Sequence, residues 1–454
     1  MEKNAQSEFR DLCRFFAGRT VADFPGEAIE KAAHVLADTL GVVVAGSKSG
    51  EVASFTDKLV RMGGHGKEGD ATCPGRREVL DPLKATLING MAGSSLEFEE
   101  GNFGAGGHPA VQIVPAVTAL CESRGFTLGR LLASLICGYE IGARIGGAVS
   151  LRRGLHPNGS WGTVGAALGA GCGCGLSGDD LVALGNIASS FAVSAYVKNS
   201  FTGRTIASSF AGMANHCGLL SLLMFESGIL PDEKCFEMTF TRFVSEGIRP
   251  EALTRDLGSS FLIVHNYVKP YPTCRFTHPA LDALERILGE HPVGPGDVDS
   301  IQVESFRAAA YSSGAAPENE GAMKFSLPHL LAARLVLGPL SLETFREDPH
   351  QMDAVRDLAG KVEMKISSSY EDMLPEHTPA RLVLRLGDGR EFSSEVLDSL
   401  GSYEEPLPKE LLRKKFLALT RPALGKDAPR VFWERIDALD METDVRELMA
   451  LLRP

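Results

Sequence analysis

Apolar residues recur at intervals of three and four through most of the first 265 positions. This spacing places them on one face of a helix. It predicts helices over residues 27–46, 51–62, 81–98, 110–124, 127–149, 159–175, 178–191 and 204–226. Several of these segments are rich in Gly and Ala, which is typical of helices that are buried on most sides and approach one another closely. The pattern predicts an all-helical domain at residues 1–265.

The spacing changes after about residue 265. Alternating apolar and polar residues predict strands at 299–305, 361–367, 381–386 and 391–396. The last two flank Gly387-Asp388-Gly389 and read as a β-hairpin. Helical spacing returns at 277–290, 326–337, 349–359 and from 408 onward. We therefore expect a mostly α fold with a smaller α+β domain at 266–407 and a helical tail at 408–454 that packs back on the first domain.

Composition narrows the class of protein. The 454 residues carry 46 Lys and Arg against 58 Asp and Glu, a net charge of -12. This balance disfavours nucleic acid and anionic membranes as partners, since both attract basic surfaces. No basic segment followed by an apolar run marks a secretory signal at the start, and the apolar runs are too short to span a bilayer. Nine scattered cysteines without zinc-site spacing predict a reducing, cytoplasmic location and no metal.

The first candidate site lies between Leu96 and Pro115. Three carboxylates, Glu97, Glu99 and Glu100, precede a loop with four glycines and a single histidine, His108. A solvated helix end followed by a turn would account for this pattern. A ligand site would account for it too, because a glycine loop allows close approach and His108 titrates near neutral pH. Taken alone, the stretch slightly favours the solvated helix end.

Two further turns carry titratable side chains between apolar helices. His156 lies in Gly154–Gly159, near the expected start of a helix, where the helix dipole lowers an imidazole pKa and anions bind. A capping turn explains this segment equally well. Lys198 and Arg204 lie in the link from Tyr196 to Arg204, where either a carboxylate-bearing ligand or an internal ion pair would satisfy them.

The expected domain junction holds another cluster. The stretch from Lys269 to Pro279 contains Cys274, Arg275 and His278, and small-molecule sites concentrate at domain junctions. Cys274 is expected to pack or to line a site rather than to act as a nucleophile. A weaker candidate is His329, which an exposed helix position would explain equally well.

Several motifs are missing from the sequence. It contains no GxGxxG after a strand, no P-loop, no HExxH and no GxSxG. Hydride transfer, phosphoryl transfer and zinc proteolysis are therefore disfavoured. Carboxylates, histidines, lysines and arginines remain, and these are the groups needed to remove a proton beside a carboxylate and to hold the resulting negative charge.

Taken together, these blocks resemble the MmgE/PrpD family of 2-methylcitrate dehydratase. The resemblance covers about residues 25–340 and keeps the family's order. It rests on Asn89-Gly90 through Glu100, His108-Pro109-Ala110, His156-Pro157-Asn158-Gly159, Lys198 with Gly203-Arg204, Lys269-Pro270-Tyr271-Pro272 with Arg275-Phe276-Thr277-His278, and Lys324-Phe325-Ser326-Leu327-Pro328. Members include 2-methylcitrate dehydratases, cis-aconitate decarboxylases and an iminodisuccinate epimerase.

The resemblance implies a two-domain homodimer without metal or organic cofactor that moves a proton beside a carboxylate of a small di- or tricarboxylic acid. The family's catalytic positions fall on Glu97, His108, His156, Lys198 and Lys269. His108 or Glu97 would remove the proton, and His156 or His278 would return a proton or assist the leaving group. The expected substrate-binding residues are Arg204, Cys274, Arg275, His278 and His329.

Four positions of the chain depart from the family pattern. Glu97 stands where Asp is usual, Phe201 where many members have His, Cys274 where decarboxylase-like members have His, and His329 where Tyr is common. A lyase of the dehydratase or decarboxylase type is the expected function. A dicarboxylate epimerase, with Lys198 or Tyr196 facing His108, is an alternative, and so is a catalytically inactive dimeric family member. A pyridoxal phosphate enzyme is disfavoured because no phosphate-binding glycine loop lies near either lysine.

Overall fold

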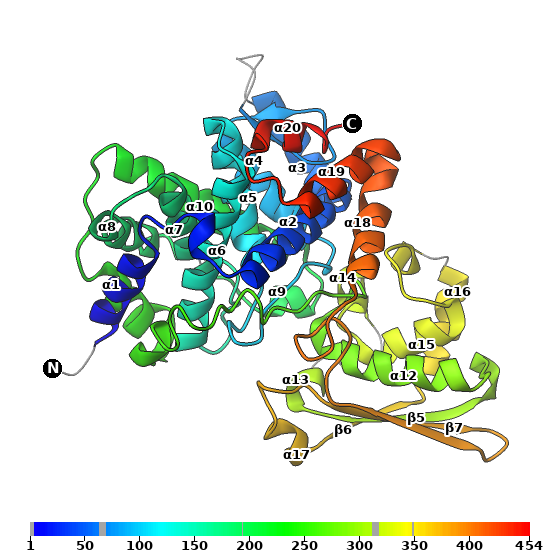
Figure 1. Cartoon of the computed structure of the whole chain (residues 1–454). Coiled ribbons are helices and arrows are strands. Elements are labelled where there is room, and N and C mark those ends of the chain that lie inside the picture. The colour runs from blue at the N-terminus through cyan, green and yellow to red at the C-terminus, as the bar shows by residue number, and fades with distance from the viewer. Residues whose placement is uncertain (1–3, 63–69, 193, 311–316, 347–348) are drawn as a thin grey trace. The chain divides into compact units, whose positions relative to one another are not determined.

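The computed structural model describes residues 4–62, 70–192, 194–310, 317–346 and 349–454. The chain divides into two compact units (Figure 1). Unit 1 contains residues 1–197, 206–267 and 408–454, and unit 2 contains residues 198–205 and 268–407. The tail from 408 thus packs within unit 1. Residues 198–205, which the sequence analysis assigned to the first domain, pack within unit 2.

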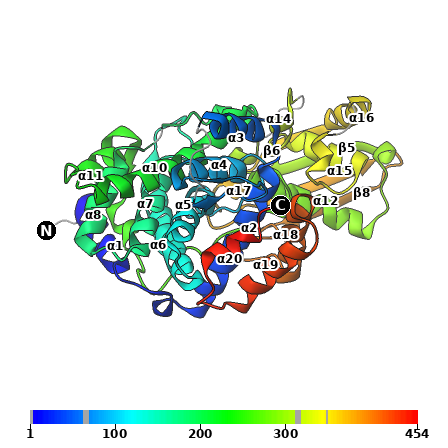
Figure 2. The same cartoon turned by 90° about the horizontal axis from the view of Figure 1, so that it is seen from above.

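Unit 1 is built mainly from helices, as the apolar spacing predicted, although two short β-ribbons depart from the expected all-helical domain. Its helices are α1 (Ala5–Phe16), α2 (Gly26–Gly46), α3 (Gly50–Met62), α4 (Pro82–Ser94), α5 (Pro109–Arg124), α6 (Leu128–Ala148), α7 (Trp161–Gly173), α8 (Gly178–Ser189), α10 (Ser208–Glu226), α11 (Cys235–Met238), α18 (Lys409–Leu424), α19 (Asp427–Ala438) and α20 (Val445–Ala450). Helix α5 is central and packs against α4, α6, α7 and α10, as Figure 2 shows from above. Short ribbons pair β1 (Ala71–Thr72) with β2 (Val79–Leu80) and β3 (Val149–Leu151) with β4 (Ser245–Ile248).

Small residues bring α6 and α7 together, which confirms the expected close packing. A Cβ atom on Gly138 would lie 2.8 Å from the carbonyl oxygen of Gly165 and 3.0 Å from the Cα of Gly169. Any side chain at this position would therefore push the two helices apart. The neighbouring stretch Thr205–Glu226 is long and apolar enough to cross a membrane, but 56% of its apolar window is buried, as in a core helix.

The end of α4 differs from the prediction, and the difference shapes the first candidate site. Helical spacing suggested a helix over 81–98, but α4 ends at Ser94. The hydroxyl of Ser95 donates to the carbonyl oxygen of Ala92 at 2.9 Å and satisfies one of the last helical acceptors. Glu97 then adopts a φ of 56°, in the left-handed region. Glu97 and Glu99 therefore lie on an irregular segment and not on a helix.

Unit 2 is an α+β unit with one four-stranded sheet. The strand order is β6 (Val362–Ile366), β5 (Val298–Ser305), β7 (Ala380–Leu386) and β8 (Glu391–Val396). Strands β5 and β6 are parallel, and the other two pairs are antiparallel. The predicted hairpin is confirmed, because β7 and β8 pair directly across the turn after Leu386.

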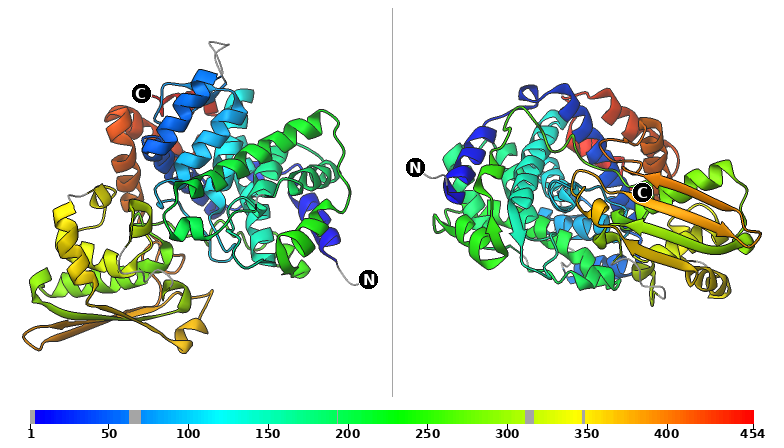
Figure 3. Two further views of the ribbon diagram at one scale, coloured as in Figure 1. Left: turned by 180° about the vertical axis from the view of Figure 1, so that it is seen from behind. Right: turned by 90° about the horizontal axis from the view of Figure 1, so that it is seen from below.

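Helices cover one face of this sheet (Figure 3). They are α12 (His278–Glu290) and α15 (Leu327–Leu337), with α16 (Pro349–Ala359) packed against α15. Ile301 and Val303 of β5 are fully buried against them, as their alternation predicted. The mostly α fold with a smaller α+β part is confirmed.

Candidate active site

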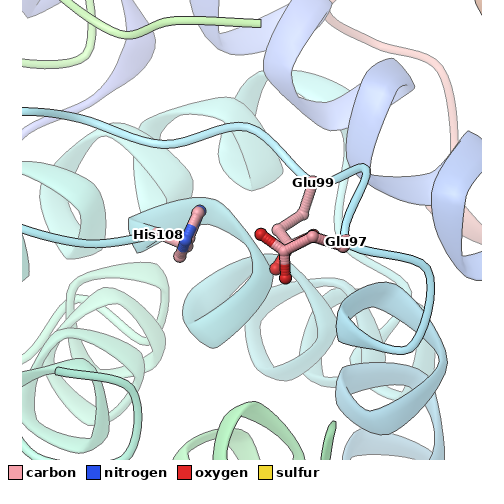
Figure 4. A group of neighbouring side chains, drawn as sticks. All are labelled: Glu97, Glu99 and His108. Atoms are coloured by element: carbon pink, nitrogen blue, oxygen red, sulfur yellow. The ribbon is translucent and has the colours of Figure 1, made fainter. Parts of the chain in front are cut away.

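Glu97, Glu99 and His108 form a cluster in unit 1. Their possible ligand atoms all lie within 4.8 Å of one another. Figure 4 shows the two carboxylates side by side, with the imidazole facing them across a short gap. The carboxylates come from the segment after α4, and His108 directly precedes α5. Two carboxylates and an imidazole are also a donor set that could hold a divalent cation.

The glycine loop between them is a compact turn. Asn102 and Gly107 exchange backbone hydrogen bonds, with N···O distances of 2.8 and 3.3 Å. The side chain of Asn102 accepts from the backbone of Ala105 at 2.9 Å and donates to the carbonyl oxygen of Leu262 at 2.8 Å. Gly106 has a φ of 64°, which a residue with a Cβ adopts at a cost. The loop therefore reverses the direction of the chain, which places His108 opposite the carboxylates of Glu97 and Glu99.

Backbone contacts fix which nitrogen of neutral His108 carries the proton. Nδ1 of His108 lies 2.8 Å from the carbonyl oxygen of Glu100. A carbonyl oxygen only accepts hydrogen bonds, so Nδ1 must carry the proton in this contact. In the neutral ring the lone pair then lies on Nε2. His108 is thereby arranged to accept a proton through Nε2.

His156 has the opposite arrangement. Its Nδ1 accepts a hydrogen bond from the backbone N–H of Asn158 at 3.0 Å, which leaves the proton of the neutral ring on Nε2. The pKa of His156 is lowered to about 4, mainly by burial and also by the proximity of His108, while Glu97 opposes the shift. Burial is therefore the main cause of the lowered pKa, whereas the sequence pattern had suggested the dipole of the following helix. At neutral pH His156 is a neutral hydrogen-bond donor.

Gln112 joins the two histidine-bearing segments. From α5 its amide nitrogen donates to the carbonyl oxygen of His108 at 3.0 Å and to Oδ1 of Asn158 at 3.1 Å. Its amide oxygen accepts from the backbone of Gly159 at 2.8 Å. Gly162 leaves room for this side chain, because a Cβ there would lie 2.0 Å from the amide oxygen. Gln112 was not among the predicted site residues, although a polar residue in the apolar first half of a helix, four positions after His108, indicates a possible role in the site.

Glu100 is fully buried beside this cluster. Its carboxyl group accepts from the backbone N–H of Ala110 at 2.7 Å, from the hydroxyl of Tyr139 at 3.0 Å and from the amide of Asn266 at 3.4 Å. Burial raises the pKa of Glu100 to about 8 in spite of these donors, and the charge of Asp38 adds to the rise. The side chain thus ties the glycine loop to α5 and α6 and remains mostly protonated at neutral pH.

This burial predicts a pH-dependent effect of Glu100→Gln on stability. The folded protein retains the Glu100 proton up to about pH 8, whereas the unfolded chain loses it near pH 4.5. The favourable contribution is therefore complete below pH 4.5 and is lost as the pH rises towards 8, with a slope of at most about 1.4 kcal/mol per pH unit. The free energy of unfolding of Glu100→Gln relative to wild type should rise across this window. Denaturant unfolding near both ends of the window measures it.

The control for this measurement is Glu51→Gln, at an exposed position on α3. Its stability relative to wild type should stay constant over the same window. Changed hydrogen bonds in Glu100→Gln add an offset that is the same at every pH, so only the change with pH is diagnostic. A stability difference that does not vary with pH would contradict the raised pKa of Glu100.

Unit 2 contains the remaining candidates from the sequence. Lys198 begins the short helix α9 (Lys198–Phe201) and is exposed, as is Arg204. Lys269 is fully buried, and Cys274 is 6% exposed. His329 is also buried, near the start of α15, and burial lowers its pKa to about 4. The alternative that His329 is an exposed helix residue is therefore wrong.

Arg275 and His278 take part in a buried hydrogen-bond network within unit 2. Arg275 donates to the carbonyl oxygens of Ser399 and Leu400 at 3.1 and 2.9 Å. It also lies 3.2 Å from Nδ1 of His278, whose Nε2 is 3.3 Å from the carbonyl oxygen of Thr273. Through these contacts both side chains stabilise the turn after β8. Their expected role in substrate binding stays a prediction.

The structure thus brings together three of the candidates, Glu97, His108 and His156, within unit 1. The other seven lie in unit 2: Lys198, Lys269, Arg204, Cys274, Arg275, His278 and His329. Glu97, His108 and His156 were predicted from the sequence, whereas the residues that orient them were not. These are Glu100 as a hydrogen-bond acceptor, Gln112 and Asn158.

Comparison with known proteins gives relatives over nearly the whole chain. A "Cis-aconitate decarboxylase-like protein oryM" of Aspergillus oryzae is 24% identical and is matched over 97% of this chain and 96% of its own length. "Cis-aconitate decarboxylase" of Homo sapiens is 24% identical, over 96% of this chain and 92% of its own. The Mus musculus protein of the same name is 23% identical, over 94% and 89%. These names point to an enzyme of the lyase type.

Two family models match the chain in succession. The MmgE/PrpD N-terminal domain matches residues 10–251, and the MmgE/PrpD C-terminal domain matches residues 271–441. The second match ends just after α19, so it includes α18 and α19, which pack in unit 1. Because the two models together cover most of the sequence in the family's order, the chain belongs to the MmgE/PrpD family.

Proposed function

We propose that this protein is a dehydratase- or decarboxylase-type lyase that acts on a small di- or tricarboxylic acid by moving a proton alpha to a carboxylate. The observation that carries this proposal is the complementary pair of histidines. The lone pair of neutral His108 lies on Nε2, and the proton of neutral His156 lies on Nε2. One ring is arranged as a base and the other as a hydrogen-bond donor, which is what a reaction at a carbon acid requires.

In a dehydration, Nε2 of His108 takes the proton from the alpha carbon. The electron pair of the broken C–H bond first remains as an enolate-like charge that the adjacent carboxylate delocalises, and it then forms the C=C bond as the C–O bond breaks. The departing hydroxyl takes up a proton from the His108 imidazolium and leaves as water, while the Nε2–H of neutral His156 donates a hydrogen bond to that oxygen. Glu97 and Glu99 stabilise the positive charge that forms on His108 within their 4.8 Å cluster.

In a decarboxylation, the C–C bond to the carboxylate breaks and CO2 leaves. The electron pair remains on the substrate carbon skeleton, and protonated His108 delivers a proton to the carbon. Lys198, Lys269 and Arg204 are proposed to bind the remaining carboxylates, since ammonium and guanidinium groups pair strongly with them. The names of the relatives, which are about 24% identical to this chain, favour decarboxylation.

An NMR assay in deuterated water tests the proposal. The purified protein is incubated with cis-aconitate, 2-methylcitrate, citrate and iminodisuccinate, each with and without a chelator. We expect one acid to lose water or CO2 at the same rate in both chelator conditions. A product of CO2 loss should carry one solvent deuterium on carbon, whereas loss of water adds none. A rate that collapses with chelator would show that the reaction requires a cation, for which Glu97, Glu99 and His108 form a possible donor set.

Two other outcomes would overturn the lyase proposal. Deuterium that enters recovered substrate without loss of water or CO2 would indicate an epimerase, for which the same pair of histidines supplies a base and an acid. Acids that bind without any exchange or product would indicate a catalytically inactive family member.

A further inference from the structure

Helix α18, the first helix of the C-terminal tail, contributes a buried cation to unit 1. Lys415 is 7% exposed in its side chain, and its ammonium lies 2.7 Å from a carboxylate oxygen of Asp38, which is 1% exposed. Asp38 belongs to α2, against which α18 packs. An ion pair removed from water in this way is costly to form unless further polar contacts use the remaining donors.

The same ammonium also contacts the segment that bears the site carboxylates. It donates to the carbonyl oxygen of Phe98 at 3.0 Å and lies 4.1 Å from the centre of the Phe98 ring. Phe98 stands between Glu97 and Glu99, whose carboxylates face His108 (Figure 4). Lys415 therefore holds both the backbone and the side chain of the residue between the two carboxylates.

The conformation of this segment needs such support. Glu97 has a φ of 56°, which is unfavourable for a residue with a Cβ and persists only where the surroundings hold it. The segment follows the end of α4 and has no helical hydrogen bonds to keep its shape. A fixed cation on Phe98 gives one physical reason why Glu97 and Glu99 stay beside His108.

We propose that Lys415 is a positioning residue of the active site, which makes the C-terminal tail a part of the catalytic machinery. Lys415 acts through Phe98 on the two carboxylates and does not itself touch the reacting atoms. The kinetic test of this inference rests on the proposed function, whereas the positioning role itself does not. The alternative is that the ion pair with Asp38 serves only to fasten α18 to α2.

A double variant separates these two roles. Lys415→Met alone leaves the buried Asp38 charge without this partner, so it destabilises the fold whichever role is correct. Asp38→Asn/Lys415→Met removes both charges and with them that penalty, so its melting temperature should stay near that of wild type. It still lacks the donor to the Phe98 carbonyl. We expect kcat to fall about 10-fold or more while KM changes by less than about 3-fold, because small displacements of catalytic groups act on the chemical step.

The matched control is Lys409→Met on the same helix. Lys409 forms an ion pair with Asp437, and both side chains are partly exposed. This variant removes a lysine and an ion pair from α18 without touching Phe98, and it should retain wild-type kcat. A double variant that melts near wild type and also keeps wild-type kcat would overturn the proposal.

A second readout does not depend on turnover. The nitrogen chemical shifts of His108, recorded by NMR at a fixed pH without substrate, report on the tautomer, protonation and hydrogen bonding of the ring, which depend on the nearby carboxylates of Glu97 and Glu99. These shifts should move in the double variant and stay unchanged in Lys409→Met. If wild type turns over none of the acids but the shifts move, the function proposal fails and the positioning role stands. Unchanged His108 shifts in the folded double variant would overturn the positioning role.

Discussion

Replacing His108 by alanine is expected to lower turnover by about 10²-fold or more, the usual contribution of a general base. The hydrogen bond from Nδ1 to the Glu100 carbonyl places the lone pair on Nε2, and no other group in the proposed mechanism takes the proton from carbon. The variant should therefore lose product formation and deuterium exchange together. Steady-state kinetics and NMR in deuterated water, with the acid that wild type converts, measure the two losses.

A histidine elsewhere in unit 1 provides the control for this experiment. Nδ1 of His216 on α10 lies 2.9 Å from the carbonyl oxygen of Leu83, so this ring makes the same type of hydrogen bond as His108. His216→Ala should keep wild-type turnover. A folded His108→Ala protein with activity close to wild type would remove His108 from the mechanism.

For an acid that loses water, replacing His156 by phenylalanine is expected to lower product formation by about 10²-fold, while deuterium exchange into recovered substrate falls much less. The reason is that the two rings act in different steps. His108 removes the proton from carbon, whereas neutral His156, with its pKa near 4, donates an Nε2–H hydrogen bond to the departing oxygen. Phenylalanine keeps the packing against Phe210, whose ring centre lies 5.5 Å from that of His156. The ratio of exchange to product, measured in one NMR experiment, reports the effect.

The control is His34→Phe on α2. Burial also lowers the pKa of His34, and its ring stacks on Trp433 with a centre-to-centre distance of 6.1 Å. This variant removes a comparable neutral imidazole away from the glycine loop and should leave both rates unchanged. Equal losses of exchange and product in His156→Phe would contradict separate roles for the two histidines.

Most helices and strands of the fold could be predicted from the sequence. Amphipathic spacing located α2, α3, α5, α6, α8, α12 and α15 to within a few residues, because each buries one face or nearly all of its surface. The hairpin β7–β8 followed from alternation around a glycine turn. The errors have local causes. Helix α4 ends early at a serine that bonds back to its own last turn, and the two-residue strands β1 and β2 are too short to show a period.

Only some residues of the candidate active site could be predicted from the sequence. The motif Glu97 to His108 and the residue His156 were visible as charged side chains beside glycine and proline, and the resemblance to the family gave them roles. Lys198 and Lys269 carry such roles by the same route, and those roles stay predictions, as does the homodimer. Nothing in the sequence pattern indicated a role for Lys415, because a lysine in an amphipathic helix is normally solvated. Only the structure places it beside buried Asp38.

The sequence by itself thus determined the helices, the hairpin, the family and the chemical types at the site, because these depend on local spacing and on residue identity. Only the tertiary structure decided which nitrogen of His108 and of His156 carries the proton, and that Gln112 joins the segments that bear these two rings. It also decided that the pKa of Glu100 is raised to about 8 and that Lys415 of the tail contacts Phe98. The physical reason is that tautomers, pKa values and buried ion pairs depend on distances between groups that are far apart in the chain and become neighbours only when the helices pack.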